Sequence, residues 1–187
     1  MDLLLKKAQL GDDKAFEEIV EQFQKKIFSY CYYVLRNTHE AEDITQEVFL
    51  KVYKNIQRCS DGNAFNPWIY KIASNQCRTV LKRKTKLQRL LKAFTSKSAQ
   101  MSSEQAYFEK TVSNIEWFQT LKVIEKQILI LRIINDQTFE AISKILDIKP
   151  ASLRKRYERI KKKVEKYRDS EGSDLYQQLR FRIREEN

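Results

Sequence analysis

Apolar residues recur every three or four positions along most of this chain, which is the spacing that gathers them on one face of an α-helix. One such pattern covers residues 13–35 and predicts a helix whose apolar face lies in a core. A second pattern begins after residues 36–38, and its predicted buried face consists of Ala41, Ile44, Val48, Val52 and Ile56. On the same helix Asp43 and Glu47 point away from that face, with Gln46, Leu50 and Tyr53 alongside them.

A third helix is predicted to begin at residues 65–68, because Asn66 can accept backbone N–H groups and Pro67 can occupy the first turn without losing a hydrogen bond. Its predicted core stripe consists of Phe65, Trp68, Ile69, Ile72 and Val80. The opposite face carries basic, hydroxyl and amide side chains, namely Lys71, Ser74, Asn75, Arg78 and Lys82. Cations and amides in register suit contacts with phosphates and base edges, so this face is a candidate nucleic-acid surface.

Helical periodicity fails over residues 93–114, where a stretch rich in Ser and Thr is typical of a linker. Beyond it the pattern predicts a helix over residues 117–131, a short helix over 139–146, a break at 147–149 and a third helix from Pro150. These last three elements have the proportions of a helix-turn-helix. The third helix has an apolar seam, which could equally serve a coiled coil. The seam consists of Leu153, Tyr157, Ile160 and Val164.

Composition and charge agree with an all-α chain that meets a polyanion. Among 187 residues there are only 3 Gly and 2 Pro, which leaves little material for turns and sheets. The net charge of +11 is concentrated in residues 65–92, with eight basic and no acidic residues, and in 150–168, with nine basic residues against two Glu. Two separated basic surfaces suggest two contacts with one polyanion, since each neutralised phosphate releases counterions. The alternative is that each is simply a solvated face.

Other functional classes find little support in the sequence. Cys31, Cys59 and Cys77 lack metal-ligand spacing and His39 is the lone histidine, so we expect no metal, no cofactor and reduced thiols. Without a Gly-rich phosphate loop or a partner for that histidine, we do not expect an enzyme. No apolar run approaches the roughly 20 residues of a membrane span, so we expect a cytoplasmic protein.

Residues 41–53 (AEDITQEVFLKVY) and 65–75 (FNPWIYKIASN) resemble the second conserved region of extracytoplasmic-function sigma factors, small bacterial proteins that guide RNA polymerase to promoters. The resemblance implies that core RNA polymerase binds Asp43, Gln46, Glu47 and Leu50. It also implies that the loop before the third helix takes up a base flipped from the melted minus-10 element. The implied minus-10 residues are Arg58, Ser60, Asp61, Gly62 and Asn63 in the loop, and Trp68, Lys71, Ser74, Asn75, Arg78 and Lys82 on the helix.

Residues 121–132 and 152–156 resemble, more loosely, the fourth region of the same family, which reads the minus-35 element. The expected DNA contacts are Ser152, Arg154, Lys155, Arg156, Arg159 and Lys162. Arg154 and Arg159 are expected to read bases, because the guanidinium fork matches O6 and N7 of guanine.

The sequence therefore predicts an all-α protein with two small helical domains, residues 1–92 and 115–168, a flexible linker between them and a tail over 169–187. The predicted partners are core RNA polymerase and promoter DNA, and the resemblance adds an anti-sigma factor. A stand-alone helix-turn-helix repressor or activator is the alternative. It would explain residues 115–168 but would leave the outward Asp43, Glu47 and Leu50 without a role.

Overall fold

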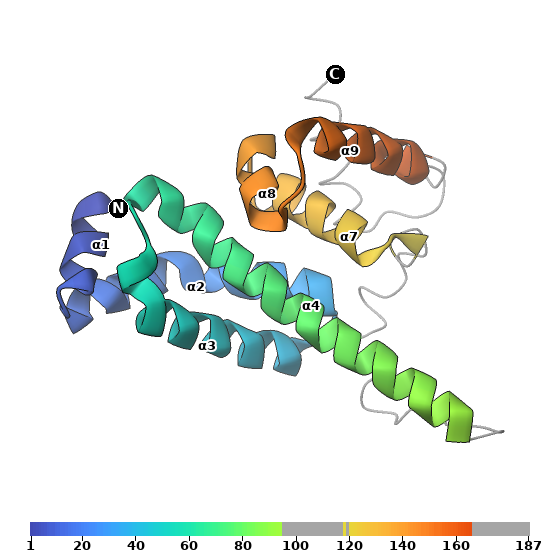
Figure 1. Cartoon of the computed structure of the whole chain (residues 1–187), viewed down its shortest axis with the longest axis horizontal. Helices are drawn as coiled ribbons and strands as arrows, with labels where there is room; N and C mark the ends of the chain where they lie inside the picture. The colour runs from blue at the N-terminus through green and yellow to red at the C-terminus, as the bar shows by residue number, and fades with distance from the viewer. Residues whose placement is uncertain (95–117, 119, 166–187) are drawn as a thin grey trace.

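The computed structural model describes residues 1–94, 118 and 120–165, and within these ranges it contains no β-strand. The N-terminal domain is a bundle of four helices around an apolar core (Figure 1). Its elements are α1 (Asp2–Gln9), α2 (Asp13–Leu35), α3 (Thr38–Asn55), the 3-10 turn η1 (Ile56–Arg58) and α4 (Gly62–Phe94). The all-helical prediction is confirmed, although the sequence patterns had not predicted α1.

Side-chain caps fix the start of α2 and α3. Asp12 Oδ1 accepts the backbone N–H of Ala15 at 3.1 Å, and Asn37 Oδ1 accepts that of Glu40 at 2.9 Å. Each cap satisfies a donor that has no partner within its helix. Both helices lie where the apolar periodicity predicted them. The five residues of the predicted buried face are all buried, four of them on α3 and the fifth, Ile56, in η1.

The start of α4 differs from the prediction. The helix begins at Gly62 rather than near Phe65, because Asp61 is the cap: its Oδ1 accepts the N–H of Ala64 at 2.8 Å. Asn66 lies inside the helix, where its amide donates to Gln137 Oε1 at 3.0 Å instead of accepting backbone N–H groups. Pro67 is tolerated near the N-terminus, where few intrahelical bonds are lost. In the predicted core stripe, Trp68, Ile72 and Val80 are half-buried, whereas Phe65 and Ile69 are fully buried.

The C-terminal domain contains α7 (Val123–Leu129), the π-helical turn η2 (Ile130–Ile134), α8 (Phe139–Leu146) and α9 (Pro150–Glu165). The short helix, the three-residue break and the third helix lie where the sequence placed them. The apolar seam of α9 is buried inside its own domain, where α9 packs on α7 and α8. The coiled-coil interpretation is therefore wrong, because no seam is left exposed for a second chain.

The two domains lie against each other. Helix α8 packs on α4, α7 and η2 pack on α2, and the far end of α4 projects beyond the C-terminal helices (Figure 1). The predicted linker and tail lie outside the described residues, except that α4 continues through residues 93 and 94. No helix in the described part of the chain is long and apolar enough to cross a membrane.

Candidate functional site

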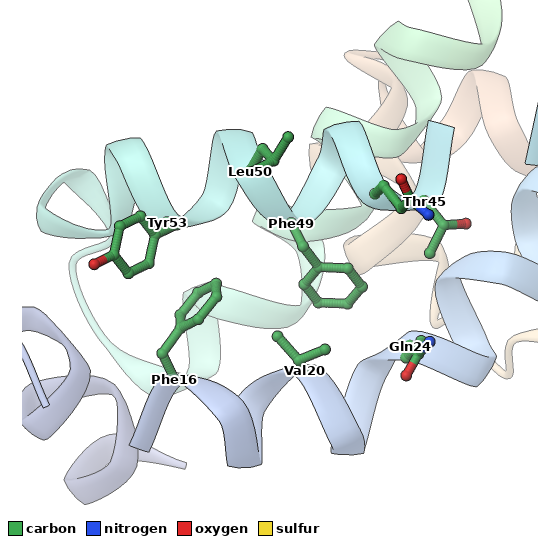
Figure 2. A pocket seen from close by; sticks show the side chains of 8 residues that line it. Phe16, Val20, Gln24, Thr45, Phe49, Leu50 and Tyr53 are labelled. Carbon is green, nitrogen blue, oxygen red and sulfur yellow. The ribbon is translucent and has the colours of Figure 1, made fainter. Parts of the chain in front are cut away.

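An apolar groove runs between α2 and α3 on the surface of the N-terminal domain. It encloses about 380 Å³ and is lined by Phe16, Val20 and Gln24 of α2 and by Thr45, Gln46, Phe49, Leu50 and Tyr53 of α3. Figure 2 shows Phe49 pointing from α3 towards α2, with Phe16 and Val20 facing it. The rings of Phe16 and Tyr53 meet edge to face, with centroids 5.0 Å apart. The groove is thus aromatic at the end formed by Phe16 and Tyr53.

Two of the four predicted polymerase-binding residues line this groove. Gln46 and Leu50 line it, and Leu50 is 59% exposed at its rim, beside the apolar side chains of the groove. Asp43 and Glu47 are exposed on the same turns of α3. Glu47 accepts a hydrogen bond from Gln76 of α4, which ties this acidic edge to the basic helix. The predicted outward face of α3 is therefore a mixed acidic and apolar surface.

The α2 side of the groove was not anticipated from the sequence. Phe16 and Val20 belong to the apolar face over residues 13–35 that the sequence places in a core, yet both are half-buried and line the groove with Gln24. The polar side chain of Thr45 is also buried there, and its hydroxyl donates to Ala41 O at 2.6 Å. That bond satisfies the hydroxyl within α3 and leaves the Thr45 methyl group to the groove. The four-residue spacing of Phe16, Val20 and Gln24 places them on one side of α2, and this was the sequence signal for the α2 wall of the groove.

Some residues of the predicted DNA face of α4 are open to solvent, and others contact the C-terminal domain. Asn75 and Lys82 are exposed, and Arg78 is half-buried. Lys71 instead pairs with Asp147 of the helix-turn-helix, with Nζ 3.0 Å from Oδ1. Trp68 is half-buried, and its ring lies 5.8 Å from that of Phe65.

The prediction that Ser74 lies on the exposed face is wrong in this arrangement. Ser74 is entirely buried, because the side chain of Gln127 from α7 covers it. Gln127 Nε2 donates to Ser74 Oγ at 3.0 Å and to the hydroxyl of Tyr30 at 3.1 Å. Burial raises the pKa of Tyr30 well above its ordinary value, since its ionised form would lose solvation there.

The stretch from η1 to the first turn of α4 presents several candidate minus-10 residues to solvent. Arg58, Ser60, Asp61 and Asn63 are exposed, whereas Gly62 is buried. The Ala64 N–H and the Ser60 hydroxyl, which donates to Asp61 Oδ2 at 3.0 Å, lower the pKa of Asp61 by stabilising its charged form. Asp61 therefore has a structural role as the cap of α4, which the sequence had not assigned to it.

The helix-turn-helix presents a basic face on α9. Ser152, Arg154, Lys155, Arg156, Arg159 and Lys162 are all exposed. Arg154 pairs with Glu140 of α8 at 3.1 Å, and its guanidinium lies 5.8 Å from the centre of the Phe139 ring. The turn begins at Asp147, which adopts a left-handed conformation with φ 54°. No cluster of three or more His, Cys, Asp or Glu that could hold a metal occurs among the described residues.

Known proteins provide an independent comparison for the N-terminal domain. Residues 19–87 match the family Sigma-70 region 2. The ECF RNA polymerase sigma factor SigW of Bacillus subtilis (strain 168) is 42% identical over 79 residues, which are 40% of this chain and 42% of that protein. The ECF RNA polymerase sigma-E factor of Haemophilus influenzae is 37% identical over 79 residues, 42% of this chain and 41% of that protein. The chain thus spans about two-fifths of the length of these curated relatives.

The fold of both domains also has a counterpart among solved structures. The structure of CnrH in complex with the cytosolic domain of CnrY matches with a TM-score of 0.67, covering 91% of this chain and 97% of that one at 16% identity. The chain therefore contains a Sigma-70 region 2 segment, and its all-helical fold is like that of CnrH. Over that segment the chain is similar to sigma factors of the extracytoplasmic-function family.

Proposed function

We propose that this protein docks on core RNA polymerase through the groove between α2 and α3 and directs it to promoters through α4 and α9. The observation that carries the proposal is the placement of two different surfaces on one small domain. The groove is apolar with acidic residues beside it, and α4 offers Asn75, Arg78 and Lys82. Because the groove is lined only by α2 and α3, both surfaces can be occupied together.

The groove fits an amphipathic helix of a partner protein. Apolar side chains of such a helix would fill the space above Phe49, while basic residues on its flank would face Asp43 and Glu47. Complementary charge beside an apolar contact favours one orientation of the partner over others. The choice of core polymerase as that partner is supported by the region 2 match and by the similarity to ECF RNA polymerase sigma factors.

The basic surfaces fit two contacts with promoter DNA. On α4, Asn75 can offer both a donor and an acceptor to a base edge, whereas Arg78 and Lys82 suit phosphates. On α9, the exposed basic residues follow the helix-turn-helix pattern, in which the N-terminal half of the second helix enters the major groove. We propose minus-10 recognition for the first surface and minus-35 recognition for the second.

Promoter binding through Lys71 and Ser74 requires the domains to separate. In the described arrangement both side chains are engaged by the C-terminal domain, through Asp147 and Gln127. We infer that α7–α9 leave α4 when DNA binds, so that the two basic surfaces can reach separate elements. A partner that covers these surfaces is also proposed, since CnrH was solved with the cytosolic domain of CnrY.

Pull-down of purified core RNA polymerase by Leu50→Asp tests the docking surface. The variant places a charge at the groove, so we expect binding to weaken at least about tenfold, the equivalent of one buried apolar side chain. Leu87→Asp is the matched control, because Leu87 is 57% exposed and lies on α4 away from the groove. Circular dichroism should show unchanged helicity for both variants.

Two results would contradict the proposal. Equal binding of Leu50→Asp and wild type would remove the groove as the docking surface. Promoter binding by the chain without any affinity for polymerase would favour the repressor or activator alternative.

A further inference from the structure

Helix α1 contacts the candidate base-binding loop, although neither the region 2 match, which begins at residue 19, nor the proposed function gives this helix a role. The side-chain amide of Gln9, at the end of α1, donates to Ile56 O at 3.0 Å and to Cys59 O at 2.9 Å. In return, the amide of Gln57 donates to the backbone oxygen of Gln9. One glutamine thus joins both ends of the turn that carries Arg58.

The other end of α1 holds the loop where it enters α4. Asp2 Oδ1 accepts the backbone N–H of Gly62 at 2.6 Å. The two backbones approach so closely that a Cβ at Gly62 would lie 2.8 Å from the backbone nitrogen of Asp2. Glycine is therefore required at this position for the contact to form.

We propose that α1 is a brace that holds residues 56–62 in the shape needed to read one minus-10 base, with Gln9 and Asp2 as its positioning residues. The inference rests on the proposed function of this loop. The brace engages backbone atoms of Ile56, Cys59 and Gly62 and leaves the side chains of Arg58 and Asn63 exposed. A loop that is already ordered loses less conformational entropy on binding, and it presents a fixed set of groups to the base.

The packing of α1 allows the brace to be removed without removing the helix. Leu5 and Ala8 anchor α1 in the core, whereas Gln9 is only half-buried and Asp2 is exposed. Gln9→Ala and Asp2→Ala should therefore keep α1 in place while deleting its contacts with the loop. Gln22→Ala is the matched control, because it removes the same side chain from an exposed position on α2.

The first measurement concerns the chain alone and needs no DNA. Amide hydrogen exchange measures how often two backbone hydrogen bonds open. The Gly62 N–H donates to Asp2 Oδ1, and the Cys59 N–H donates to Ile56 O at 3.1 Å. We expect at least about tenfold faster exchange of the Gly62 N–H in Asp2→Ala and of the Cys59 N–H in Gln9→Ala. Gln22→Ala should exchange like wild type.

The second measurement concerns base selectivity. Each chain, assembled with core polymerase, is mixed with single-stranded oligonucleotides that carry six randomised positions, and the bound fraction is sequenced. We expect Gln9→Ala to lower the enrichment of the preferred base at one position by about tenfold, while total oligonucleotide binding changes less than about twofold. A role limited to stability would not weaken one position selectively.

The outcomes separate this inference from the proposed function. Unchanged exchange at Gly62 and Cys59 would show that α1 does not hold the loop. Faster exchange with an unchanged base profile would leave α1 as a structural element only, and would overturn its role in recognition. If wild-type holoenzyme itself selects no base at any position, the proposed function of the loop fails, and the brace loses its purpose with it.

Discussion

The side-chain amide of Gln127 donates a 3.0 Å hydrogen bond to the hydroxyl of Ser74, although 53 residues separate the two along the chain. Both side chains are entirely buried, one from each domain. The same seam includes the Asn66–Gln137 hydrogen bond, and Asn135 Nδ2 donates to Lys26 O at 3.3 Å. Water can replace such bonds when the domains part, so a polar seam of this kind suits an interface that opens and closes.

Gln127→Glu is expected to open the protein. The substitution keeps the shape of the side chain but places a carboxylate in the buried seam, and hydration of the charge favours the separated domains. Fluorescent labels on cysteines introduced at the exposed Lys54 and Lys162 should report a longer interdomain distance. The three native cysteines are buried, so the labels can be directed to the new sites.

The pH dependence of this variant gives an internal check. Burial raises the pKa of the new carboxyl in the closed form above about 4.3, its ordinary value. The closed form is therefore favoured below that value and is lost as the pH rises through the raised pKa. Gln22→Glu adds the same charge at an exposed site and should leave the distance unchanged. A Gln127→Glu distance equal to that of wild type at pH 8 would show that the seam does not hold the domains together.

High pH should unfold the N-terminal domain through its buried tyrosines. Burial raises the pKa of Tyr30, and also that of Tyr70, above the ordinary value of about 10. Because the pKa in the folded state is the higher one, stability is intact below pH 10 and falls as the pH rises beyond it. Urea unfolding between pH 8 and 11 should show this decline, and Tyr30→Phe should show a shallower one. A flat profile for wild type would contradict the burial of these hydroxyls.

The turn of the helix-turn-helix should be sensitive to backbone strain at Asp147. Its φ of 54° is left-handed, a conformation that Asn tolerates and β-branched residues avoid. We expect Asp147→Val to lower the free energy of unfolding by about 1–2 kcal/mol more than Asp147→Asn does. Both variants lose the ion pair with Lys71, so the difference isolates the backbone. Equal urea midpoints for the two variants would mean that the turn relaxes to another conformation.

DNA binding by α9 should distinguish its arginines from its lysines. Arg159→Ala is expected to lose about 1–3 kcal/mol at one base pair of the upstream element and to relax selectivity there. Lys162→Ala should weaken all sequences alike and reduce the salt slope of binding by about one unit, as expected for one phosphate contact. Binding of holoenzyme to promoters with single substitutions, at several salt concentrations, measures both effects. If neither residue affects binding to any sequence, α9 is not the recognition helix.

Sequence periodicity predicted the elements whose packing lies within one domain. The helices α2, α3, α8 and α9 were located because their buried residues repeat at helical spacing. The caps Asp12 and Asn37, which fix two of their starts, were identified only in the structure. The start of α4 was misplaced because Asn66 and Asp61 are both capable caps, and only the folded chain decides between them. Ser74 was misassigned because the pattern within one helix carries no information about a second domain that covers it.

The groove was predictable only on its α3 side. Leu50 stands out as an apolar residue off the buried stripe, whereas Phe16 and Val20 continue the apolar face of α2 and look like core residues in sequence. Their partial exposure depends on the angle between α2 and α3, which is a tertiary property. The brace formed by α1 was missed for a similar reason, since Gln9 and Asp2 contact atoms about 50 to 60 residues away.

The π-helical turn Ile130–Ile134 has a consequence for which changes of chain length the protein can accept. A π-helical turn holds one residue more than an α-helical turn, and here it lies just before Asn135 and Gln137, which contact the N-terminal domain. Deleting one residue would allow α7 to continue as a regular helix but would rotate the next segment of the chain about the helix axis by roughly 100°. A homologue one residue shorter at this point would keep its helix-turn-helix but would lose the hydrogen bonds that Asn135 and Gln137 make with the N-terminal domain.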